Sequence, residues 1–128
     1  MPKEILLIDD DENELEIFCD ALHVIDKTIT CTQTKNLTEA MEYLQHNSPG
    51  YIFIDFDMPT GSGVECLSEL KKLTKLDESK FILYSNHIDA DISQRAIDLG
   101  AYRCIKKPSM IDLLARRLKE VLETDHNF

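Results

Sequence analysis

Acidic residues gather at two places in the sequence, Asp9–Asp11 and Asp55–Asp57, and each group follows an apolar run. Carboxylates held within a few ångströms of one another repel, so such a cluster persists when a cation neutralises it. Oxygen ligands select a hard ion, which favours a partly hydrated Mg²⁺, with Mn²⁺ as a possible substitute. A solvated turn that caps a helix is the alternative, but it accounts for only one of the first three acids, Asp11.

A hydroxyl and an ammonium group follow two later apolar runs. Ser85 comes directly after Lys80–Tyr84, and Lys106 and Lys107 come directly after Tyr102–Ile105. Phosphoryl transfer needs a nucleophile in line and positive charge on the equatorial oxygens, which a carboxylate, a metal, a hydroxyl and a lysine together supply. A lone serine or lysine at such a position is more often merely exposed. The set of four is more specific and predicts phosphoryl-transfer chemistry.

Five short apolar runs alternate with five segments of helical periodicity. The runs are predicted to be strands, and they are Glu4–Ile8, Thr28–Thr32, Tyr51–Ile54, Lys80–Tyr84 and Tyr102–Ile105. Leu15–Leu22 and Leu37–Leu44 carry apolar residues at i, i+3, i+4 and i+7. Ile92–Leu99 carries a shorter apolar stripe, Leu114–Leu122 a longer one, and Val64–Leu73 is also predicted to be helical although its phase is less regular. Asn36, Ser62 and Ser109 are predicted helix caps, and Gly100 is a predicted helix stop.

This alternation predicts an α/β fold with three layers and a doubly wound, five-stranded parallel sheet. Right-handed crossovers leave few topologies, and the flavodoxin-like order 2-1-3-4-5 is the commonest for this number of strands. Its ligand site lies beyond the carboxyl ends of the first and third strands, so both acidic groups should converge there. The length of 128 residues fits one domain over residues 1–128, with a core over about 4–122 and no room for an output domain.

Charge and hydropathy exclude several classes of function. The net charge of −10 argues against a nucleic-acid partner and against docking on anionic lipid. The sequence has no apolar run long enough to span a bilayer and no signal peptide, which predicts a cytoplasmic protein. The four cysteines form no C-x-x-C pair, so buried free thiols are a better interpretation than zinc ligands.

At this point the sequence resembles the receiver domain of two-component response regulators, of the CheY-like, stand-alone type. The resemblance extends from Ile5 to about Leu122 and is specific because several motifs occur in order. These motifs are Asp9-Asp10, an Asp-x-x-Met-Pro-x-x-x-Gly run from Asp55 to Gly63, Ser85, Leu99-Gly100-Ala101, and Lys107-Pro108.

The resemblance implies a metal site around a phosphoacceptor. Asp55 would take the phosphoryl group as 4-aspartylphosphate. Asp10 and Asp55 would bind the metal directly, Asp9 would bind it through water, and the backbone carbonyl of Asp57 would complete the protein ligands.

The resemblance also implies roles for the hydroxyl and the ammonium. Ser85 would hydrogen-bond the phosphoryl group. Lys107 would pair with Asp55 before phosphorylation and with the phosphoryl oxygens afterwards, with Lys106 as the second candidate. A cis peptide bond between Lys107 and Pro108 is expected, since cis bonds are essentially a proline feature.

Three positions depart from the family's pattern or are expected to tune it. Cys104 stands where the family has its switch aromatic, and a thiol cannot swing between buried and exposed states as a tyrosine does. Tyr102 is the candidate substitute, because alternation along a strand puts it on the same face as Cys104. His87 and Asp57 occupy positions that influence how long the phosphoryl group lasts, although the sequence leaves the sign of that effect open.

The implied function is a phosphorylation-driven binding module rather than an enzyme acting on other molecules. A histidine kinase or a histidine phosphotransfer protein would donate the phosphoryl group, and a face formed by the fourth helix, fifth strand and fifth helix would select a downstream protein partner. One alternative is a haloacid-dehalogenase-type phosphatase that uses Asp55 and Asp57, whose turnover would survive mutation of Asp9 and Asp10. The other alternative is a degenerate receiver that acts as a constitutive interaction module.

Overall fold

The computed structural model describes residues 4–56, 63–73, 79–86, 88–108 and 110–124. Strands and helices alternate along these residues as the sequence predicts. In chain order they are β1 (Glu4–Ile8), α1 (Glu12–Ile25), β2 (Thr30–Thr34), α2 (Leu37–Leu44), β3 (Tyr51–Asp55), α3 (Gly63–Leu70), β4 (Lys80–Ser85), α4 (Ala90–Asp98), β5 (Arg103–Lys106) and α5 (Ile111–Thr124).

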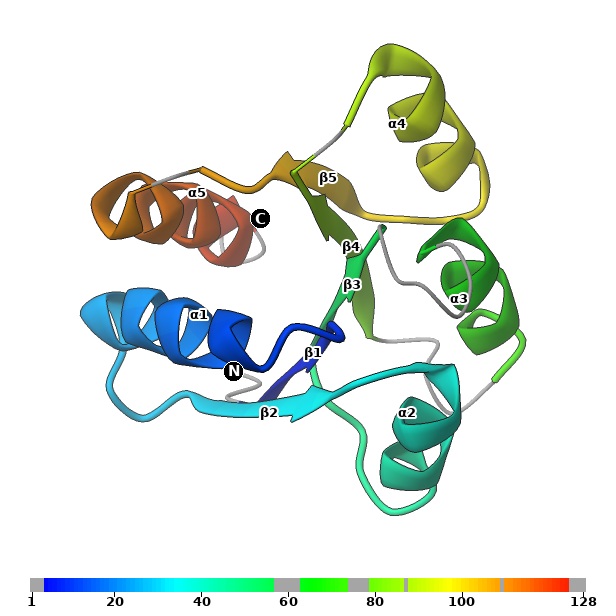
Figure 1. Cartoon of the computed structure of the whole chain (residues 1–128), viewed down its shortest axis with the longest axis horizontal. Coiled ribbons are helices and arrows are strands. Elements are labelled where there is room, and N and C mark those ends of the chain that lie inside the picture. Colours follow the sequence, from blue (N-terminus) through cyan, green and yellow to red (C-terminus); the bar gives the residue numbers. More distant parts are fainter. Residues whose placement is uncertain (1–3, 57–62, 74–78, 87, 109, 125–128) are drawn as a thin grey trace.

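The strands form one parallel sheet in the order β2-β1-β3-β4-β5. Helices α1 and α5 cover one face, and α2, α3 and α4 cover the other (Figure 1). The predicted three-layer, doubly wound fold with the order 2-1-3-4-5 is therefore confirmed. All side chains of β3 are buried, as are those of β1 and β4 after their first residue, which explains why these central strands are apolar on both faces.

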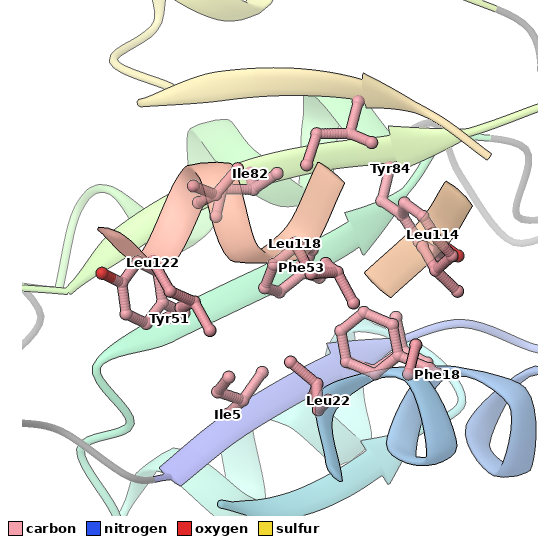
Figure 2. Packing of buried hydrophobic residues seen from close by; sticks show 14 of the residues in the cluster. Ile5, Phe18, Leu22, Tyr51, Phe53, Ile82, Tyr84, Leu114, Leu118 and Leu122 are labelled. Carbon is pink, nitrogen blue, oxygen red and sulfur yellow. The ribbon is translucent and has the colours of Figure 1, made fainter. Parts of the chain in front are cut away.

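Alternation along β1 divides the core into two clusters. Ile5 and Leu7 face α1 and α5, whereas Leu6 and Ile8 face α2 and α3. On the face covered by α1 and α5, side chains from these two helices pack against side chains from the central strands (Figure 2).

Three aromatic side chains, Phe18, Phe53 and Tyr84, pack α1 against the central strands. The rings of Phe18 and Phe53 meet edge to face with centroids 4.9 Å apart, and the rings of Phe53 and Tyr84 are 6.1 Å apart at 89°. Such geometries add roughly 0.5–1.5 kcal/mol per pair beyond simple burial. Because Tyr84 is the residue before Ser85 at the end of β4, this packing also sets the position of α1 relative to the carboxyl edge of the sheet.

Strand β2 begins two residues later than the sequence predicts. The Asp26 side chain accepts hydrogen bonds from the Thr28 backbone N–H at 2.9 Å and from its hydroxyl at 2.6 Å. The Thr28 N–H is therefore hydrogen-bonded within a local turn rather than to a neighbouring strand. Aspartate favours turns through such side-chain hydrogen bonds to the backbone. The strand also ends two residues later, at Thr34, which pairs in register with Ile8.

The helix ends largely follow the predicted signals. Asn36 caps α2 by accepting from the Glu39 N–H, and Asp11 caps α1 by accepting from the Asn13 N–H. Gly100 follows the C-cap of α4 with φ 102°, a conformation that suits glycine. The predicted caps Ser62 and Ser109 lie outside the described residues.

The cysteines are free thiols, as predicted, but only Cys66 is fully buried. Burial raises the pKa of the Cys66 thiol to about 12. Cys19, Cys31 and Cys104 are half-buried, so the expectation of burial is wrong for these three.

Gly63 links the start of α3 to the end of β3. A Cβ atom at Gly63 would lie 2.7 Å from the carbonyl oxygen of Asp55 and 2.8 Å from the Cα atom of Phe56. Because both obstacles are backbone, we expect Gly63→Ala to destabilise the domain by about 1–3 kcal/mol, the usual cost of overpacking. Urea unfolding measures this loss, and a variant that unfolds at the wild-type urea concentration would contradict the close contact.

Candidate functional site

An open cavity of about 450 Å³ lies at the carboxyl edge of the sheet. The described residues that line it are Asp9, Asp10, Asp11, Glu14, Asp55, Asn86 and Lys107. The strand register brings them together, since Ile8 pairs with Ile54 and Asp55 pairs with Tyr84. The predicted convergence of the two acidic groups at one edge is therefore confirmed for Asp9, Asp10 and Asp55, whereas Asp57 lies outside the described residues.

Three carboxylates form a group that could hold a metal ion. Asp9, Asp10 and Asp55 each offer an oxygen within 4.8 Å of the others. Asp9 and Asp55 are buried, and Asp10 is exposed. Hard oxygen donors that are partly open to solvent fit a cation that keeps some of its water, such as Mg²⁺.

Lys107 supplies the positive charge among these acids. Its Nζ atom lies 2.9 Å from Asp9 Oδ2, 3.5 Å from Glu14 Oε1 and 3.7 Å from Asp55 Oδ1, and its side chain is only 7% exposed. Its neighbour Lys106 is exposed and does not line the cavity.

Of two expectations for Lys107, one is confirmed and the other is wrong. The predicted pairing with Asp55 is confirmed at 3.7 Å, although the shortest contact of the ammonium, at 2.9 Å, is with Asp9. The Lys107–Pro108 bond is trans, since no peptide bond in the described chain is cis. The trans form is favoured by about 0.5–1 kcal/mol even before proline.

The electrostatic potential in the cavity is negative, because five carboxylates and one lysine among the described residues line it. Burial alone would lower the pKa of Lys107, but the hydrogen bond to Asp9 and the charges of Asp9, Asp55 and Glu14 outweigh it and raise the pKa above its usual value. Burial raises the pKa of the Tyr84 hydroxyl, and the charges of Glu14, Asp9 and Asp55 raise it further. The cavity therefore keeps Lys107 charged and favours cations.

Gln33 fixes the loop that carries the acids. Its Nε2 atom donates to the carbonyl oxygens of Asp9 at 2.6 Å and Asp11 at 2.9 Å, on either side of Asp10. Asp9 Oδ1 accepts from the Asp11 N–H at 3.0 Å, which tightens the same turn. Gln33 was not among the predicted site residues, because a second strand that ends at Thr32 stops one residue short of placing this amide beside Asp9.

Ser85 lies at the end of β4 but does not line the cavity. It is fully buried, and its carbonyl oxygen accepts from the Lys107 N–H at 2.8 Å. Phe81 and Leu83 pack on the α2–α4 face, and alternation places Ser85 on that face too. Asn86, which follows it, lines the cavity instead. The phosphoryl-binding role of Ser85 stays a prediction.

The two candidate switch residues lie on different faces of the sheet. Cys104 packs with the α2–α4 cluster, where its thiol lies 4.0 Å from the Ser93 carbonyl of α4. Tyr102 packs with the α1–α5 cluster, and the Nζ atom of Lys80 lies 5.0 Å from its ring centre. The prediction that they share a face is wrong because β5 begins at Arg103, so strand alternation does not extend back to Tyr102. His87 lies outside the described residues.

The chain belongs to the response regulator receiver domain family, whose features it matches over residues 5–119. It is 28% identical to the phosphate regulon transcriptional regulatory protein PhoB of Pseudomonas aeruginosa, over 94% of this chain and 52% of that protein. It is 26% identical to a protein-glutamate methylesterase/protein-glutamine glutaminase of Agrobacterium fabrum, over 95% of this chain and 36% of that protein. The chain thus spans about half or less of the length of these curated relatives.

Solved structures share the same fold. The phosphorylated cyanobacterial phytochrome response regulator RcpA superposes with a TM-score of 0.83 at 24% identity, covering 96% of this chain and 93% of that one. The chemotaxis response regulator CheY4 of Vibrio cholerae superposes with a TM-score of 0.81 at 18% identity, covering 94% and 99%. Across the described residues, no helix combines the length and apolar character needed to cross a bilayer.

Replacing Lys107 tests its part in neutralising the acids. Lys107→Met leaves Asp9 buried without its cation, so we expect a loss of about 3–5 kcal/mol in the free energy of unfolding at neutral pH. Lys106→Met is the matched control, and its exposed side chain should change stability by less than about 0.5 kcal/mol. Urea unfolding of both variants measures the difference, and equal stabilities would contradict the buried pair.

The same interaction gives stability a defined dependence on pH. Folding raises the pKa of Lys107 above its ordinary value of 10.5. The contribution of Lys107 to the free energy of unfolding is therefore fully present below pH 10.5, and it is lost as the pH rises through the pKa of Lys107 in the folded protein. The stability difference between the wild-type protein and Lys107→Met should therefore shrink in strongly alkaline buffer. Urea unfolding across that pH range measures it, and a constant difference would contradict the raised pKa.

Proposed function

We propose that this chain is a phosphoacceptor of two-component signalling, which takes a phosphoryl group on Asp55 in a Mg²⁺-dependent reaction. The observation that carries the proposal is the position of Asp55. Its carboxylate stands at the end of the central strand β3, within reach of Asp9 and Asp10 and 3.7 Å from the Lys107 ammonium. The donor would be a histidine kinase or a histidine phosphotransfer protein.

The proposed reaction is a transfer from phosphohistidine to a carboxylate. One oxygen of Asp55 forms a bond to phosphorus while the bond from phosphorus to the donor's imidazole nitrogen breaks. The nitrogen keeps the bonding pair and takes a proton from solvent, and the product is an acyl phosphate on Asp55. The Lys107 ammonium lies 3.7 Å from Asp55, so it would be close enough to donate to an oxygen of the transferred phosphoryl group.

The acidic cluster is the proposed binding site of the divalent cation. Asp9, Asp10 and Asp55 would hold Mg²⁺, or Mn²⁺ in its place, with the backbone carbonyl of Asp57 as a further proposed ligand. A bound cation supplies positive charge that offsets the repulsion between these carboxylates and an incoming phosphoryl group. Ser85 is the proposed hydrogen-bond partner of that group, and His87 and Asp57 are the proposed modulators of its lifetime.

The output would be a change of partner rather than turnover of a substrate. The face formed by α4, β5 and α5 is the proposed docking surface for a downstream protein. Cys104 joins β5 to α4 within it, through the contact to Ser93. The charge of −10 supports a protein partner over nucleic acid or anionic membrane, and a cytoplasmic location agrees with phosphorylation by a histidine kinase.

Phosphorylation with a small donor tests the proposal. Incubation with acetyl phosphate and Mg²⁺ should add one phosphoryl group, stable in acid and labile to hydroxylamine, because the acyl phosphate forms on Asp55. Intact-mass measurement detects the addition, and Asp55→Asn should abolish it. A labelled Asp55→Asn protein would show that another residue accepts the group.

Removing a metal ligand tests the cation site. Asp10→Asn should weaken Mg²⁺ binding and slow phosphorylation. It should leave stability in metal-free buffer unchanged or slightly higher, because it relieves repulsion between neighbouring carboxylates. Calorimetric Mg²⁺ titration and urea unfolding separate the two effects. A chelator that unfolds the wild-type protein would instead indicate a structural metal.

The phosphatase alternative predicts a different result. A haloacid-dehalogenase-type enzyme would turn over a small phosphate ester with Asp55 and Asp57, and it would not need the cluster at Asp9 and Asp10. Membership of the receiver family weighs against it. If the protein hydrolyses such an ester catalytically, and the Asp9→Asn and Asp10→Asn variants retain this activity, the phosphatase alternative would be favoured.

A further inference from the structure

Glu14 is an acid in the cavity that the proposed chemistry does not use. It is the third residue of α1 and lines the cavity beside Asp9 and Asp55. Its side chain is 21% exposed, and its Oε1 atom lies 3.5 Å from the Nζ atom of Lys107. Beyond Asp9, Asp10 and Asp55, two further acids line the cavity, Glu14 and the helix cap Asp11, and only Glu14 is left without an assigned role.

Helix capping does not account for this position. Asp11 caps α1, and an acid three residues later commonly closes a capping box by accepting from the N–H of the cap. Here the Asp11 N–H donates to Asp9 Oδ1 at 3.0 Å, so that donor is already engaged. The helix dipole favours an acid in the first turn but does not direct it toward the cavity. Glu12, in the same turn, instead pairs with Lys35.

Three carboxylates surround one ammonium group. A lysine ammonium has three protons to donate, and Asp9, Glu14 and Asp55 lie at 2.9, 3.5 and 3.7 Å from Nζ. The Nζ atom also lies over the Tyr84 ring, 5.1 Å from its centre. Of the three acids, Asp55 is the farthest, so the ammonium sits toward β1 and α1.

We propose that Glu14 is a positioning residue that holds Lys107 on the α1 side of the cavity, and that its charge favours the divalent cation while opposing the phosphoryl group. The inference rests on the proposed function and deepens it. Phosphorylation raises the negative charge at an acceptor to about −1.5 to −2, so the product needs Lys107 more than free Asp55 does. Glu14 competes for the same ammonium and repels the new charge, whereas it attracts a cation.

The variant Glu14→Gln removes the charge and keeps the size of the side chain. We expect Mg²⁺ affinity to fall and both the rate and the extent of phosphorylation at saturating Mg²⁺ to rise, each by about two- to fivefold, the range for one partly exposed charge. Calorimetric titration with Mg²⁺ gives the first quantity. Intact-mass measurement with acetyl phosphate gives the second.

The opposite signs of the two effects separate positioning from mere structural support. A structural defect would lower both Mg²⁺ affinity and phosphorylation, and that outcome would overturn the inference. Glu14→Asp, which keeps the charge on a shorter side chain, should retain the wild-type Mg²⁺ affinity.

Glu12→Gln is the matched control. It removes the same charge from the same helical turn but from a side chain that pairs with Lys35 outside the cavity. We expect it to behave like wild type in both measurements, and effects as large as those of Glu14→Gln would overturn the inference. A wild-type protein that takes up no phosphoryl group would contradict the proposed function. A wild type that is phosphorylated no differently from Glu14→Gln would contradict only the role of Glu14.

Discussion

The buried contact between Lys107 and Asp9 is the interaction on which the candidate site depends. It joins residues 98 positions apart and ties the end of β5 to the end of β1 across the sheet. Both side chains are 7% exposed or less, so little water screens them. Removing either partner would leave an uncompensated buried charge, so this pair offsets part of the repulsion among the five carboxylates that line the edge.

The sheet order and the main acids were predictable because they follow from periodicity and a topological rule. Apolar strands of the right length, alternating with amphipathic segments, leave few arrangements, and the rule for parallel sheets then puts Asp9, Asp10 and Asp55 at one edge. Other features depend on contacts that periodicity does not encode. The preference of Lys107 for Asp9, the clamp by Gln33 and the turn at Asp26 each arise from local or tertiary hydrogen bonds.

The faces of the sheet also constrain how the site could communicate with α4. Tyr102 packs on the α1–α5 side, with its ring beside Lys80 at the start of β4, so it cannot take the place that Cys104 occupies next to α4. The thiol of Cys104 is half-buried and reaches the Ser93 carbonyl at 4.0 Å. At this position the contact between β5 and α4 is therefore made by a small side chain and a backbone carbonyl rather than by a large aromatic ring.

The charges of the cavity have opposite effects on the two activities proposed for it. Each carboxylate that attracts a divalent cation also repels the anion that would be transferred to Asp55. Lys107 is the one cation among the described lining residues, and it stands nearest to Asp9 with Glu14 beside it. The position of this ammonium decides how much of its charge is available to Asp55. The balance between the proposed cation binding and the proposed phosphoryl acceptance would therefore depend on how Asp9, Glu14 and Asp55 share the Lys107 ammonium.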